Sequence, residues 1–140
     1  MSVQPPDRRT GSKATGLLAG LTLFILAGCS GVSMGVADLG NTRQTALGPV
    51  LVDADGNTLY TYDPDSSGTS KCTGTCAVVW PPAEAEAGAK PNKSFTIITR
   101  PSGTHQWAYK DKPLYGYMFD DGPGSVSGDG EDGVWHVAKP

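Results

Sequence analysis

Short runs of β-branched and aromatic residues alternate with turn-forming segments through most of the chain after residue 46. We expect strands at 50–52, 58–62, 95–99, 106–109, 114–117 and 135–137, because these runs are rich in β-branched and aromatic residues and turn-forming segments rich in Gly, Pro and Asp lie between them. Residues 53–57 are predicted to form the turn between the first two strands. No mature segment has a helical period, and residues 84–90 have room for one helical turn at most. The pattern predicts an all-β domain at 47–140.

The N-terminus has a different pattern. Basic residues precede an apolar run at 17–26, which at ten residues is too short to span a bilayer but is typical of a signal-peptide core. The run ends in a lipobox, Leu26-Ala27-Gly28-Cys29. We therefore expect cleavage of residues 1–28, lipidation of Cys29 and a flexible tether at 29–46; an ordinary secretory signal with an unrelated cysteine is the alternative.

The domain repeats itself at an offset of 55 residues, without a gap across the central part of each copy. Rare residues coincide at this one offset, which indicates a true internal duplication of about 48–82 into 103–137. Two copies are too few for a solenoid, so we expect two pseudo-repeated halves of short antiparallel strands in one small domain. The matched motif residues are Tyr60 with Tyr115, Tyr62 with Tyr117, Asp65 with Asp120, and Trp80 with Trp135.

Both copies read Tyr-x-Tyr-x-x-Asp, with a tryptophan fifteen residues after the aspartate. Together with the lipobox, this motif resembles the family of predicted bacterial lipoproteins with a Yx(FWY)xxD motif, also described as a secreted repeat. The segment from Cys72 to Cys76 that leads to Trp80-Pro81-Pro82 is similar to that family's cysteine-containing segment. The resemblance covers residues 48–139 and implies a fold and an extracytoplasmic location. It implies no biochemical activity.

The cysteines and the charge limit the possible partners. With Cys29 lipidated, Cys72 and Cys76 remain as an even pair, which we expect to be a structural disulfide outside the cytoplasm. A redox pair or a metal site is the alternative, although the three-residue spacing differs from both common redox motifs.

Loss of residues 1–28 leaves 8 basic and 13 acidic side chains, a net charge of about −5. This charge argues against nucleic acid, so the membrane partner is reached through the lipid on Cys29.

The duplicated aromatic motif is the main candidate site. The two tyrosines of each copy share one strand face, so the four rings form either a common core, with the aspartates accepting their hydroxyls, or a platform for a flat ligand. An acidic loop is interpreted as solvated or as a weak cation site; its members are Asp120, Asp121, Asp129, Glu131 and Asp132. A copper site at His105, Met118 and His136 is a further hypothesis. We expect no cofactor and no resident metal.

The motifs of the common enzyme classes are missing from this sequence. We therefore expect a binding or interaction module, lipid-anchored at the outer face of the plasma membrane or, in a host with two membranes, at the outer membrane. A redox or metal-binding accessory lipoprotein and a purely structural envelope component are the two alternatives.

Overall fold

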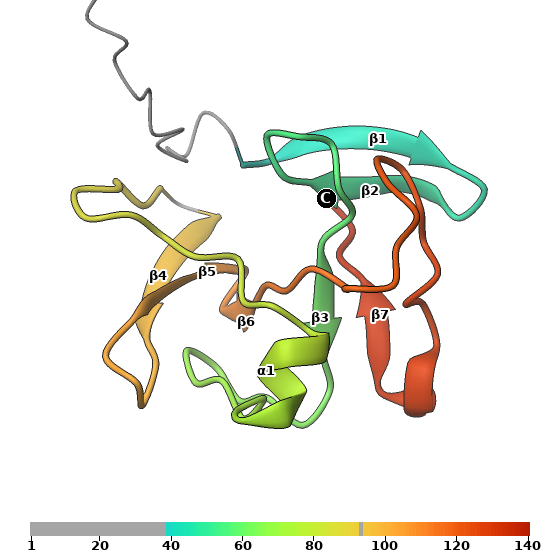
Figure 1. Cartoon of the computed structure of the whole chain (residues 1–140). Helices are drawn as coiled ribbons and strands as arrows, with labels where there is room; N and C mark the ends of the chain where they lie inside the picture. The colour runs from blue at the N-terminus through green and yellow to red at the C-terminus, as the bar shows by residue number, and fades with distance from the viewer. Residues whose placement is uncertain (1–38, 93) are drawn as a thin grey trace, which may run out of the picture. The chain divides into compact units, whose positions relative to one another are not determined.

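A computed structural model describes residues 39–92 and 94–140 (Figure 1). The expected signal peptide, Cys29 and most of the expected tether lie outside these residues. The described chain contains β1 (Asn41–Thr45), β2 (Gly48–Val52), β3 (Tyr60–Tyr62), α1 (Thr75–Val79), β4 (Phe95–Thr99), β5 (His105–Tyr109), β6 (Lys112–Pro113), the 3-10 turn η1 (Glu131–Gly133) and β7 (Trp135–Val137). The all-β prediction is confirmed. Among the described residues there is no helix with the length and hydrophobicity needed to cross a membrane.

The strands form three small antiparallel sheets. β1 pairs with β2, and β4, β5 and β6 form a second sheet in that order. The third sheet joins the two repeats, because β3 of the first repeat pairs with β7 of the second, with Tyr62 opposite Trp135. The two halves therefore exchange strands instead of folding side by side.

The prediction of a strand at 114–117 is wrong in detail. Its backbone takes the place equivalent to β3, with Tyr115 bridged to Pro82 and the Gly116 N–H donating to the Pro81 carbonyl at 2.8 Å. Two consecutive prolines lack the N–H groups that the matching β7 residues supply, so no continuous ladder forms there. Only the preceding Lys112–Pro113 pair is a regular strand, β6.

The two hairpins are equivalent despite a local shift. Leu51 N–H donates to the Ala138 carbonyl and Trp107 N–H donates to the Ala83 carbonyl, each at 2.8 Å. The alanines are 55 residues apart but the donors are 56 apart. The reason is one extra residue in the second hairpin, because the connection from Arg100 to Thr104 is one residue longer than the equivalent connection from Thr45 to Gly48. The shorter turn before β6 restores the offset of 55 by Leu114. The prediction of two repeated halves in one domain is confirmed.

The expected tether extends too far toward the C-terminus. Leu39 is buried and Asn41–Thr45 forms β1, so ordered structure begins before residue 46. Four of the five β1 residues are exposed and polar, and the strand is held by backbone pairing with β2, so it has no hydrophobic alternation to signal it. The sequence also missed α1, whereas the helical turn considered at 84–90 is only a reverse turn, closed by Ala89 N–H on the Glu86 carbonyl.

Candidate functional site

The duplicated motif lies at the contact between the two repeats. Tyr60 and Tyr115, which are equivalent residues, pair with each other through both backbone hydrogen bonds, at 2.8 and 3.0 Å. Both side chains are completely buried. A residue paired with its own counterpart marks a pseudo-twofold relation between the halves.

The tyrosine hydroxyls cross between the repeats. Tyr60 Oη donates to Asp120 Oδ2 at 2.9 Å, and Tyr115 Oη donates to Asp65 Oδ2 at 2.7 Å. Each carboxylate also accepts a backbone N–H from its own repeat, at 2.7 Å for Asp65 and 3.0 Å for Asp120. Each aspartate thus fixes its local loop and holds the tyrosine of the other repeat.

Burial sets the protonation of this cluster. It raises the pKa of both Tyr60 and Tyr115, and the neighbouring carboxylates raise the pKa further. Burial also raises the pKa of the Asp65 carboxyl, while the hydrogen bonds from Lys71 N–H and Tyr115 oppose the shift. The tyrosines therefore stay protonated and serve as hydrogen-bond donors to the aspartates.

Four aromatic rings form a continuous stack across the same contact. Trp80 lies on its counterpart Trp135 with ring centroids 3.8 Å apart and an angle of 4°. Tyr62 covers the other face of Trp135 at 4.2 Å, and Tyr117 covers the other face of Trp80 at 4.1 Å. Both tryptophans are buried, so only the outer faces of the two half-buried tyrosines are left for a flat ligand.

A buried polar network that joins the two repeats has no counterpart in the sequence predictions. Arg100 is 7% exposed and donates to Ser70 Oγ at 2.8 Å, Gln106 Oε1 at 2.6 Å and the Cys72 carbonyl at 2.6 Å. Because the Tyr115 hydroxyl gives its one proton to Asp65, Ser70 Oγ donates to Tyr115 Oη at 2.8 Å, which links the network to the motif. No local signal in the sequence marks Arg100 as buried, because it lies directly before a polar turn.

The disulfide between Cys72 and Cys76 is present, as expected, with the Cα atoms 5.2 Å apart. The bond spans the start of α1, and the Cys72 residue is buried. The Cys72 carbonyl that accepts from Arg100 is therefore held by a short covalent loop.

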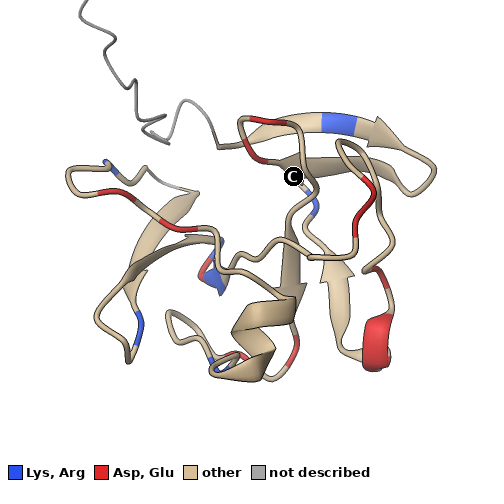
Figure 2. Cartoon of the chain, in the orientation of Figure 1, with Lys and Arg blue, Asp and Glu red and all other residues tan. Residues whose placement is uncertain are grey.

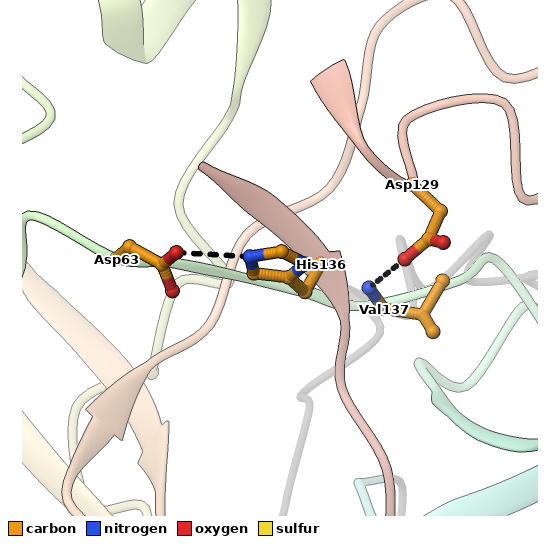
Figure 3. Close-up of polar contacts among 4 residues, drawn as sticks. All are labelled: Asp63, Asp129, His136 and Val137. Atoms are coloured by element: carbon orange, nitrogen blue, oxygen red, sulfur yellow. Dashed lines mark hydrogen bonds and ion pairs between the residues drawn. The ribbon is translucent and has the colours of Figure 1, made fainter. Parts of the chain in front are cut away.

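The remaining candidates make separate local contacts. Asp53 accepts N–H groups of Asp55 and Asn57, both at 2.9 Å, and forms the expected turn. Figure 3 shows His136 against Asp63, with 2.9 Å between Nε2 and Oδ2, and Asp129 accepting the Val137 N–H at 2.9 Å.

The two histidines lie on different sheets, since His105 belongs to β5 and His136 to β7. Within residues 39–92 and 94–140, no three His, Cys, Asp or Glu side chains are grouped as a metal site.

A family model described as a secreted repeat of unknown function matches residues 41–84 and again residues 96–139. The two matches are offset by 55 residues, as are the motif residues, and extend beyond both ends of the repeats delimited from the motif. No curated protein and no solved structure matches the chain. Because the matched segments cover more than half of the chain, the protein belongs to this family of secreted repeats.

Proposed function

We propose that this protein is a lipid-anchored extracytoplasmic binding module, in which the duplicated motif is the scaffold and the surface outside it binds the ligand. One observation supports this division. Both faces of each motif tryptophan are covered by other motif rings, and both buried tyrosine hydroxyls donate to motif aspartates. The tryptophan faces and the tyrosine hydroxyls of the motif are thus occupied by contacts within the fold, so other surface residues are left to recognise a ligand.

Three features support the anchored location. The lipobox ends at Cys29, the matching family is described as secreted, and the Cys72–Cys76 bond suits an oxidising compartment. Lipoprotein processing attaches a diacylglyceryl group, and two acyl chains are enough for stable anchoring where one is marginal.

Replacement of Cys29 tests the anchor. Cys29→Ser should reduce incorporation of labelled fatty acid to background and leave the precursor uncleaved. The double variant Cys72→Ser/Cys76→Ser is the matched control, because it removes two other cysteines and should keep full labelling. Undiminished labelling of Cys29→Ser would exclude lipid attachment at this residue.

Native mass spectrometry tests the binding role. The protein is purified in detergent from its own host and is expected to carry a bound small molecule that departs on collisional activation. A spectrum that contains only the lipidated chain, under conditions that preserve known weak complexes, would contradict the proposal.

A further inference from the structure

The duplication creates a pair of equivalent surface grooves, one beside β7 and one beside the segment 81–84. The first, the basic groove, has a volume of about 310 Å³ and includes Thr61, Tyr109, Lys110, Lys112, His136 and Lys139 in its lining. The second, the acidic groove, has a volume of about 580 Å³ and includes Asp53, Glu84 and Glu86.

The two grooves correspond position by position. Ala138 of the basic groove and Ala83 of the acidic groove accept equivalent backbone hydrogen bonds, and the next residue in each is charged. That residue is Lys139 in the basic groove and Glu84 in the acidic one, so the charge is reversed at one structural position. The same backbone thus presents opposite electrostatic surfaces in the two halves.

The basic groove contrasts with the rest of the domain. Its lining contains three lysines and a histidine and no carboxylate, although the mature chain has a net charge of about −5. Figure 2 shows acidic segments spread over several loops, and basic ones at β6 and beside the C-terminus as well as on β1 and near the end of β4. Clustered lysines in a concave surface attract anions and concentrate them locally.

The side chains of this groove are positioned by contacts around it. Lys139 Nζ donates to the Leu47 carbonyl, and Lys110 Nζ lies 4.8 Å from the centre of the Tyr109 ring. His136 is held by Asp63, which is 2.9 Å away and belongs to a neighbouring pocket. That pocket shares Lys110 and Lys112 with the groove but also contains carboxylates, which repel an anion, so the groove itself is the more favourable place for one.

A two-residue hairpin turn brings two of the lysines to the groove. Its central residues, Lys110 and Asp111, have the positive φ angles that such a turn requires, 48° and 64°, although lysine rarely adopts this region. The equivalent turn in the first repeat is longer and places Gly56 at a φ of 86°. A non-glycine residue held at a positive φ costs folding free energy, and such positions cluster at functional sites.

We propose that the basic groove is the ligand site of this module and binds a small molecule with a phosphate or carboxylate group, whose apolar part lies against Tyr109 and Val137. This inference depends on the proposed binding function. Lysine is suited to such a group because its ammonium is a compact point charge with three donors.

The test is a titration of the full-length protein in neutral detergent, followed by ¹H–¹⁵N NMR at low ionic strength. Phenyl phosphate, benzoate and inorganic phosphate are the probes. We expect saturable shifts confined to amides lining the basic groove, weaker binding as salt is added, and tighter binding of a probe with a ring. Binding by phenyl phosphate alone identifies a phosphate ligand, and binding by benzoate alone identifies a carboxylate.

Two matched variants separate this site from general charge effects. Lys139→Glu should weaken binding about tenfold, because it replaces an attraction with a repulsion next to the anion. Glu84→Lys at the equivalent position of the acidic groove should leave the shifts in the basic groove unchanged. Lys112→Ala is a second test and should also weaken binding, because no hydrogen bond of the Lys112 side chain is found among the described residues and its loss removes only a positive charge from the groove.

Three results would overturn the inference: no saturable shift with any probe, shifts centred elsewhere, or unchanged binding by Lys139→Glu. Concentration-dependent shifts at both grooves without a probe would replace it with head-to-tail association of two copies. If the groove fails while native mass spectrometry still detects a ligand, the site assignment is wrong and the binding role stands. If neither detects a ligand, both fail.

Discussion

Removal of one hydroxyl from a crossed tyrosine–aspartate pair is the most direct test of how the two repeats hold each other. In Tyr115→Phe the ring stays in a fully buried position, while Asp65 loses a 2.7 Å donor and Ser70 loses a 2.8 Å partner. In Tyr60→Phe, Asp120 loses the equivalent donor at 2.9 Å. Each carboxylate keeps its backbone N–H, so neither becomes unpaired.

The expected loss follows from the type of bond. A hydrogen bond to a charged acceptor contributes about 1.5–3 kcal/mol, so each variant should lose about 2 kcal/mol of unfolding free energy. For a domain of this size, such a loss lowers Tm by about 8–16 °C. Urea denaturation with the disulfide intact measures the difference, and pseudo-symmetry predicts similar values for the two variants.

Tyr62→Phe is the matched control. Its ring stacks on Trp135 in the same core, but no hydrogen bond of its hydroxyl is found among the described residues, so the change should stay within about 0.5 kcal/mol. If Tyr60→Phe and Tyr115→Phe unfold like the wild type, or if Tyr62→Phe loses as much as they do, the crossed pairs do not hold the repeats together.

Three further predictions follow from the core. The contribution of Tyr60 and Tyr115 to the free energy of unfolding should be full below pH 10 and should fall above it by about 2.7 kcal/mol per pH unit. The reason is that both tyrosines titrate at 10.0 in the unfolded chain but have raised pKa values in the folded protein. Urea titrations at about pH 9 to 11 should show half this slope for Tyr60→Phe. Gly128→Ala should cost about 1–3 kcal/mol in thermal melts, since its Cβ would lie 2.7 Å from Trp80, whereas the control Gly116→Ala meets nothing nearer than 3.9 Å. Cys72→Ser/Cys76→Ser should lose about 2 kcal/mol at most and remain folded by circular dichroism, and a larger loss would mean that the disulfide does more than close a short loop.

The sequence predicted what depends on local pattern. Strands 95–99 and 135–137 match β4 and β7, because both contain aromatic or β-branched residues between clear turn signals. The duplication was visible because its rare aromatic residues coincide at one offset. The same reasoning failed for β1, where pairing with β2 orders a polar segment that has no alternation of its own.

The sequence alone could not show which aspartate each tyrosine hydroxyl binds. The motif suggested that each aspartate accepts a tyrosine hydroxyl, but a repeat by itself does not show whether the tyrosine is its own or its neighbour's. The structure selects the neighbour, since Tyr60 reaches Asp120 and Tyr115 reaches Asp65. Burial of Arg100 was hidden for a similar reason, because its acceptors Ser70 and Cys72 lie 30 and 28 residues away.

Comparison of the two halves separates what the fold requires from what it permits. Each repeat contributes one tryptophan to the stack, one tyrosine to the backbone pair and one hydroxyl to the crossed contacts, so both repeats are needed to close the shared core. The disulfide and the charge at Lys139 occur once, on a backbone that also accommodates Glu84 at the equivalent place. Because the shared core does not require these single features, their chemistry distinguishes one face of the domain from the other. A ligand that tells the two faces apart must therefore contact residues at which the repeats differ, and both grooves present such residues on a concave surface, with lysines in the basic groove and carboxylates in the acidic one.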